Sequence, residues 1–203
     1  MARIEAVPAK DAGVFGRLVY RLVRRRFGDV MEPVAVARHH RGVFRASVVH
    51  EGMVERSLRV LPAGLRALVV YRVATVLGCS WCVDFGDMKM RLDGLDTGRL
   101  GELDEYATSA AFDGTERAAL AYADGMSASP PHVTDEQVAE LERLLGRAGL
   151  VELTYLVALE NARARFNDAL GIRDQGFAAN CAVSPVSPAS PVSRRSPASP
   201  AGG

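Results

Sequence analysis

Two cysteines separated by two residues are the most reactive side chains of the sequence, in the order Cys79-Ser80-Trp81-Cys82. Gly78 directly precedes them and is typical of a helix end, so we expect the pair to open the next helix. Free backbone N–H groups and the positive end of the helix dipole favour a thiolate there. Thiol pKa values in such settings fall from about 8.5 toward ~3.5–7.5, which provides a nucleophile at neutral pH. A thiolate at Cys82 can then attack a peroxide or a disulfide, and Cys79 can resolve the product.

Three other interpretations of the cysteine pair stay open on the residues alone. The two thiols could be small hydrophobic core residues, or a redox pair that the fold forms but no longer uses. They could also be half of a zinc site, which needs four ligands. The remaining cysteine, Cys181, and the scattered histidines give no recognised second half. We therefore expect neither a metal nor a cofactor.

Helices are the elements that must position this pair. Pro62 opens an apolar helix predicted over residues 65–77, and the helix that begins with the cysteine motif is predicted over 80–92. No run of alternating β-branched residues occurs, so the predicted class is all-α. Spacing and capping patterns predict six further helices, over residues 14–27 (basic and amphipathic), 32–54, 100–106, 113–128, 134–145 and 150–170.

The composition is that of an ordinary folded domain. The 203 residues are 48% hydrophobic and 24% charged with a net charge of +1, which gives no global field to attract nucleic acid or a membrane surface. No apolar leader follows Met1 and no run is long enough to span a bilayer, so we expect a cytoplasmic protein without nucleic-acid or membrane partners. The Ser/Pro-rich tail over residues 183–203 is predicted to be disordered.

Two stretches resemble the carboxymuconolactone decarboxylase superfamily. They are residues 65–74 with the following 78–84, which hold the cysteine motif, and Leu159-Glu160-Asn161-Ala162-Arg163-Ala164-Arg165-Phe166-Asn167. The alkylhydroperoxidase D (AhpD-like) type is the most similar, because the decarboxylases proper generally lack the two cysteines. The similarity covers about residues 30–172. It divides the chain into a basic N-terminal helix (1–30), an AhpD-like domain (31–172) and the tail (183–203).

This resemblance implies an AhpD-like helical bundle that assembles into homo-oligomers. It also implies a peroxiredoxin-like alkylhydroperoxidase, an oxidoreductase that acts as a thiol-dependent peroxidase or a disulfide reductase. The substrate would be a small hydroperoxide or a thiol or disulfide, with a protein reductant. By the same resemblance, Cys82 is the attacking thiolate and Cys79 its partner in a redox-active disulfide.

The sequence departs from the family at its proton relay. Peroxidase members carry a glutamate and a histidine where this chain has Ala67 and Gly86. Two alternatives therefore stay open: a cofactor-free decarboxylase or isomerase, and a non-catalytic helical scaffold. The side chains that could replace the relay or line a pocket are Tyr71, Trp81, Asp84 and Glu160. Glu160 shares a helix face with Arg163 and Asn167, and its alternative role is a structural ion pair with Arg163 or a hydrogen-bonded anchor for another helix.

Overall fold

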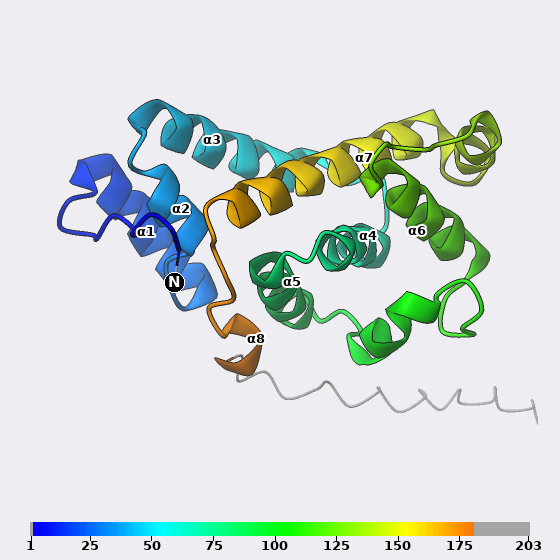
Figure 1. Cartoon of the computed structure of the whole chain (residues 1–203), viewed down its shortest axis with the longest axis horizontal. Helices are drawn as coiled ribbons and strands as arrows, with labels where there is room; N and C mark the ends of the chain where they lie inside the picture. Colours follow the sequence, from blue (N-terminus) through cyan, green and yellow to red (C-terminus); the bar gives the residue numbers. More distant parts are fainter. Residues whose placement is uncertain (1, 181–203) are drawn as a thin grey trace, which may run out of the picture.

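The structure, a computed structural model, describes residues 2–180 and contains helices but no β-strand within them, which confirms the predicted all-α class. The predicted tail and Cys181 lie outside the described residues. In chain order the elements are α1 (Gly13–Phe27), α2 (Glu32–Ala37), α3 (Arg41–Ser57), α4 (Ala63–Val76), α5 (Ser80–Leu92), the 3-10 helix η1 (Gly98–Glu105), α6 (Gly114–Ser127), α7 (Asp135–Ala169) and α8 (Phe177–Asn180) (Figure 1).

Local signals define several helix ends as predicted. Asp113 and Thr134 each form a complete capping box, with Glu116 and Gln137 respectively, at the start of α6 and α7. Gly146 has a φ of 69° and interrupts α7, close to the predicted boundary between helices over 134–145 and 150–170. Only glycine adopts this left-handed conformation without a steric cost, so the interruption follows from the residue type.

The single helix predicted over residues 32–54 is wrong. The chain forms α2 and α3 instead, and His40 between them has an extended backbone, with φ −108° and ψ 99°. The Nδ1 atom of His40 accepts a hydrogen bond from the backbone N–H of Val43 at 3.1 Å, which caps α3. This local side-chain contact satisfies a free helix-start donor and replaces the continuous helix that the apolar spacing predicts.

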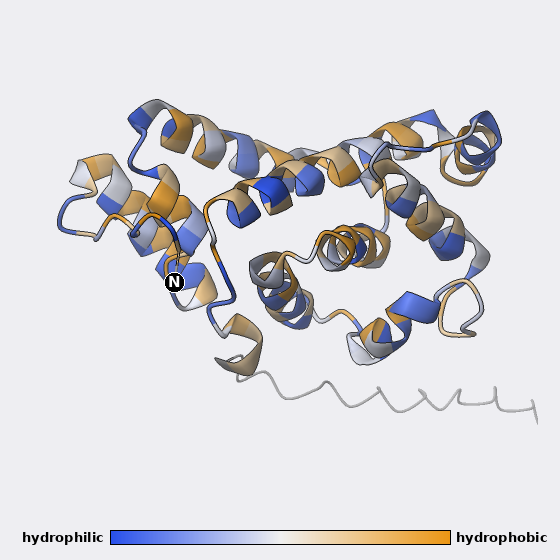
Figure 2. Ribbon diagram, viewed as in Figure 1, coloured by the Kyte–Doolittle hydropathy of each residue, from blue (hydrophilic) through white to orange (hydrophobic). Residues whose placement is uncertain are grey.

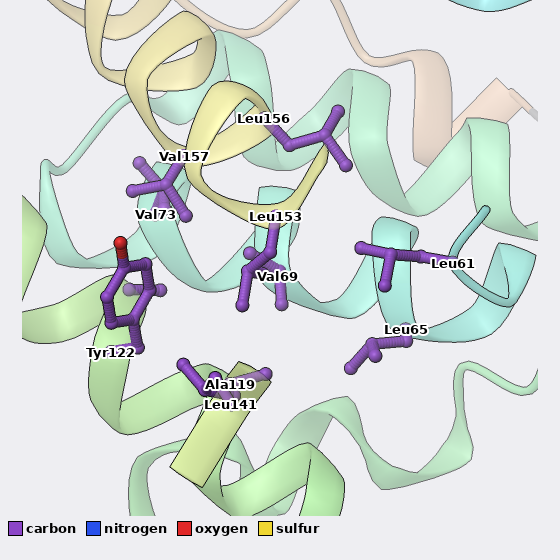
Figure 3. Close-up of a cluster of buried hydrophobic side chains, with 11 residues drawn as sticks. Leu61, Leu65, Val69, Val73, Ala119, Tyr122, Leu141, Leu153, Leu156 and Val157 are labelled. Carbon is purple, nitrogen blue, oxygen red and sulfur yellow. The ribbon is translucent and has the colours of Figure 1, made fainter. Parts of the chain in front are cut away.

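The main core surrounds α4, which packs against α7 and has α5 and α6 on either side (Figure 1). Figure 2 shows that α4 is largely apolar, as its central place requires. The side chains of this core point toward one another in Figure 3, and they come from α4, α6, α7 and the loop before α4: Leu61, Leu65, Val69, Val73, Ala119, Tyr122, Ala123, Leu141, Leu153, Leu156 and Val157.

The N-terminal helices form a smaller cluster of their own. Tyr20 of α1 packs edge-on against Phe44 of α3, with ring centroids 6.4 Å apart, and Val19 and Ala35 complete the contact with α2. The basic helix predicted at the N-terminus thus packs against α2 and α3, while Val14, Leu18 and Leu22 of its apolar residues stay exposed. None of the helices in residues 2–180 combines the length and apolar character needed to cross a bilayer.

Candidate functional site

The cysteine motif lies at the junction of α4 and α5. Gly78 has a φ of 66° and reverses the chain after α4, and Cys79 is the N-cap of α5. The Cys79 sulfur accepts a hydrogen bond from the backbone N–H of Cys82 at 3.2 Å, and the two sulfurs form a disulfide with the Cα atoms 5.3 Å apart. This is the helix-start placement that the sequence predicts.

Both sulfurs are buried in a mainly apolar cluster. Cys79 is 3% exposed and Cys82 6%. The buried members of the wall come from α2, α4, α5, α7 and the C-terminal segment, by which we mean residues 172–180, and Ala2, Phe27 and Met31 of the N-terminal part pack against them. These buried members are Val36, Ala74, Trp81, Met88, Ala164, Ile172 and Phe177. Such surroundings disfavour a thiolate unless hydrogen-bond donors compensate for the lost water.

Of the side chains that the structure describes, one polar group forms hydrogen bonds with the sulfurs. The side-chain amide nitrogen of Asn167, on the last turns of α7, lies 3.4 Å from the Cys82 sulfur and 3.6 Å from the Cys79 sulfur. Asn167 is 2% exposed. The sequence interpretation placed it beside Glu160 and not on the cysteines. The signal that could have identified it is an asparagine in a buried helix turn, where such a residue needs a partner.

Trp81 and Asp84 hold the C-terminal segment against α5. The Trp81 ring stacks on Phe85 with centroids 5.0 Å apart and meets Phe177 edge-on. The Asp84 carboxylate accepts three backbone hydrogen bonds of 2.8–2.9 Å from residues 175, 177 and 178. Both predicted pocket residues therefore help to cover the cysteines, and Asp84 is engaged by backbone donors rather than by a sulfur.

Tyr71 of α4 lines a cleft of about 500 Å³ that lies beside α5. Ser80, Val83 and Asp84 also line this cleft, whereas neither cysteine does. The Cδ2 atom of Tyr71 would lie 3.3 Å from a Cβ placed on Gly86, so the tyrosine ring occupies the space next to the position of the relay histidine. Burial, with a smaller effect of Asp87, raises the pKa of Tyr71, and its phenol stays protonated at neutral pH.

Glu160 forms the ion pair considered in the sequence interpretation. Its carboxylate lies 3.1 Å from the Arg163 guanidinium, which also bonds Glu51 of α3. Burial raises the pKa of Glu160 to about 7, and Arg163 partly opposes the shift. Glu160 precedes Asn167 by seven residues on the same face of α7, which corresponds to ~10 Å along the axis. The structure therefore places it two turns from the cysteines.

The described residues contain no group of three or more His, Cys, Asp or Glu side chains arranged to hold a metal ion. Among these residues the chemistry of the site is thus that of two sulfurs, one backbone N–H and one carboxamide. None of the hydrogen-bonding groups on the sulfurs can take up or release a proton near neutral pH.

Comparison with known proteins places this geometry in context. No family model matches the sequence. The chain is 34% identical to the uncharacterized protein YnjA of Escherichia coli (strain K12) over 155 residues, which are 76% of this chain and 85% of YnjA.

Solved structures of similar fold share less sequence. The debrominase Bmp8, crystallised as a cysteine-to-alanine variant with 2,3,4-tribromopyrrole, is 19% identical with a TM-score of 0.76 over 87% of this chain and 93% of its own. The alkylhydroperoxidase AhpD core of an uncharacterized peroxidase-related protein from Ralstonia eutropha JMP134 is 17% identical. Its TM-score is 0.73, over 87% of this chain and 94% of its own.

Proposed function

The chain belongs to the family of YnjA and has the AhpD-like fold, and from this premise we propose that it is a thiol–disulfide oxidoreductase whose redox centre is the Cys79–Cys82 pair. The observation that carries the proposal is the placement of both sulfurs at the start of α5, bonded to each other and supplied with N–H donors. A pair in this position can open and close without any rearrangement of the helix.

The two sulfurs have different tasks in this proposal. Cys79 receives hydrogen bonds from the Cys82 N–H and from Asn167, and it is therefore the sulfur better able to carry negative charge when the disulfide opens. An external thiolate attacks the Cys82 sulfur, the S–S bond breaks, and Cys79 leaves as a thiolate. A second external thiolate then releases Cys82 as a thiolate and forms the oxidised reductant.

In the other half of the cycle the reduced pair acts on its substrate. The Cys82 thiolate attacks a sulfur of the substrate disulfide and expels one substrate thiolate. The Cys79 thiolate then attacks Cys82 in the mixed disulfide, which restores the Cys79–Cys82 bond and releases the second substrate thiolate. Two electrons pass from the external reductant to the substrate over the whole cycle.

Within the described part of the chain no acid group contacts the sulfurs, which favours a disulfide over a hydroperoxide as substrate. A peroxide must release an alkoxide or hydroxide, which needs a proton, whereas a disulfide releases a thiolate of ordinary pKa near 8.5. The resemblance assigns the proton relay to positions 67 and 86, which hold Ala67 and Gly86. Hydroperoxides, and brominated aromatics by analogy with Bmp8, are therefore second candidates.

The test is turnover with dithiothreitol as reductant and glutathione disulfide, tert-butyl hydroperoxide or tribromopyrrole as the alternative substrates. We expect the glutathione disulfide rate to be the largest above the uncatalysed rate, and Cys82→Ser to abolish it. Equal rates for wild type and Cys82→Ser would remove the pair from the mechanism. Turnover that survives alkylation of both cysteines would likewise exclude the pair from the mechanism.

A further inference from the structure

Asn167 has an unusual hydrogen-bonding situation. Asparagine is unfavourable inside a helix and costly to bury, so a buried asparagine is expected to have strong partners. Within the described part of the chain, its side-chain nitrogen donates only to the two sulfurs of the disulfide. Disulfide sulfur is a weak acceptor, which leaves this donor poorly satisfied in the oxidised state.

Opening of the disulfide changes this balance. A thiolate is a charged acceptor, and hydrogen bonds to charged groups are about twice as strong as neutral ones. The amide nitrogen already lies within 3.6 Å of both sulfurs, so it can donate to whichever sulfur carries the charge without moving its helix. The backbone carbonyl of Asn167 accepts the N–H of Ile172 at 2.9 Å, which fixes this turn of α7.

Among residues 2–180, no charged side chain forms a hydrogen bond with either sulfur. The carboxylate of Asp84 on α5 is turned to the C-terminal segment, and Asp168 on α7 lies 3.5 Å from Arg173. Glu160 is paired with Arg163 two turns away. The residues that α2 and α4 contribute to the cluster, Val36 and Ala74, are apolar.

We infer that Asn167 is a catalytic residue, whose side-chain amide donates to the thiolate released when the Cys79–Cys82 disulfide opens. The amide favours the reduced over the oxidised pair, and it makes the leaving sulfur a better leaving group. The catalytic role of Asn167 rests on the proposed function, but the effect of its amide on the thiolate can be measured without turnover.

The experiment compares Asn167→Leu and Asn167→Asp with the wild type in the full chain. Leucine keeps the branching and the number of side-chain heavy atoms and removes the donor, while aspartate keeps the shape and replaces the donor by a negative acceptor. Asn161→Leu is the matched control, because Asn161 is also buried on α7 but donates to Ser127 and to the carbonyl of Val157. The readout is the pH midpoint of thiolate absorbance at 240 nm in the reduced protein, with the glutathione redox equilibrium as a second measurement.

We expect the midpoint to rise by about one unit or more in Asn167→Leu, and further in Asn167→Asp, since a hydrogen bond to a charged group has this magnitude. The equilibrium should shift about tenfold toward the disulfide in Asn167→Leu, and Asn161→Leu should match the wild type. If Asn167→Leu does not fold, Asn167→Asp alone decides the question. A midpoint that is unchanged in the folded variants would overturn the inference.

The two proposals fail in different ways. Wild-type protein that reduces no disulfide, combined with a raised midpoint in the Asn167 variants, removes the proposed function and keeps the donor–thiolate contact. Normal wild-type turnover, combined with an unchanged midpoint, keeps the function and removes Asn167 from it.

Discussion

The indole N–H of Trp81 donates a hydrogen bond to the side-chain oxygen of Gln175 at 2.7 Å. The same oxygen accepts the backbone N–H of Glu32 at the start of α2, and the Gln175 amide nitrogen donates to the carbonyl of Val30. One side chain thus joins the cysteine helix, the N-terminal helices and the C-terminal segment. Any molecule that approaches the sulfurs across this segment must first break these contacts.

The first prediction concerns this access. Asp84→Asn leaves one acceptor oxygen for three backbone donors of the C-terminal segment. Loss of charge-assisted hydrogen bonds favours opening of the segment, and we expect about tenfold faster reduction of the disulfide by dithiothreitol. Asp87→Asn is the control, since Asp87 pairs with Arg91 within α5. Equal rates for Asp84→Asn and Asp87→Asn would show that the segment does not limit access.

The second prediction concerns Tyr71. Its ring lines a cleft to which neither cysteine contributes, and it packs beside Gly86. Tyr71→Phe removes a hydroxyl that contacts neither sulfur, so the rate of glutathione disulfide reduction should stay within about twofold of wild type. A tenfold loss in this assay would mean that the phenol supplies a proton during turnover.

The third prediction is a pH dependence of stability from Glu160. Its pKa is about 7 in the folded chain because of burial, against an ordinary value of about 4.3. Between these two values the folded chain retains a proton that the unfolded chain has released. The contribution of Glu160 to the free energy of unfolding is therefore greatest below about pH 4, falls by roughly 4 kcal/mol as the pH rises through 7, and is constant above.

Urea unfolding at pH 5 and pH 8 measures this effect. Glu160→Gln removes the titrating group and should reduce the loss of stability between the two pH values. Glu142→Gln is the control, because Glu142 pairs with the exposed Arg147 at the surface of α7. The assignment is incorrect if Glu160→Gln and wild type lose the same free energy over this range.

The fourth prediction concerns the contribution of the disulfide to the stability of the folded chain. The cysteines are separated by three positions, and a loop this short restricts the unfolded chain little. Loop-closure entropy gives about 2 kcal/mol, so the reduced protein should remain folded at 25 °C with a slightly lower urea midpoint. The double variant Cys79→Ala/Cys82→Ala should show no response to dithiothreitol. Global unfolding on reduction would indicate a structural rather than a redox pair.

Features that depend on neighbouring residues could be predicted from the sequence. The N-caps Asp113 and Thr134 start α6 and α7, and the reversal at Gly78 places the cysteine motif at the start of α5. Each of these signals acts within one helical turn. The break at His40 is also local, but it depends on a ring nitrogen reaching one backbone N–H, which apolar spacing does not reveal.

The surroundings of the sulfurs could not be predicted in the same way. Periodicity correctly places Glu160 and Asn167 on one face of α7, yet two turns separate them and each meets a different neighbour. Glu160 lies beside Arg163, which binds Glu51 of α3, whereas Asn167 faces the cysteines of α5. Which helix lies opposite each turn is a property of tertiary packing, and the residues involved are more than eighty positions apart.

Trp81 is the only tryptophan of the chain and lies between the two cysteines. Its ring is buried in the same cluster as both sulfurs and stacks on Phe85. All indole emission of the protein therefore originates at the candidate site. A change in the cysteine pair or in its cover can be followed by intrinsic fluorescence, without an added label.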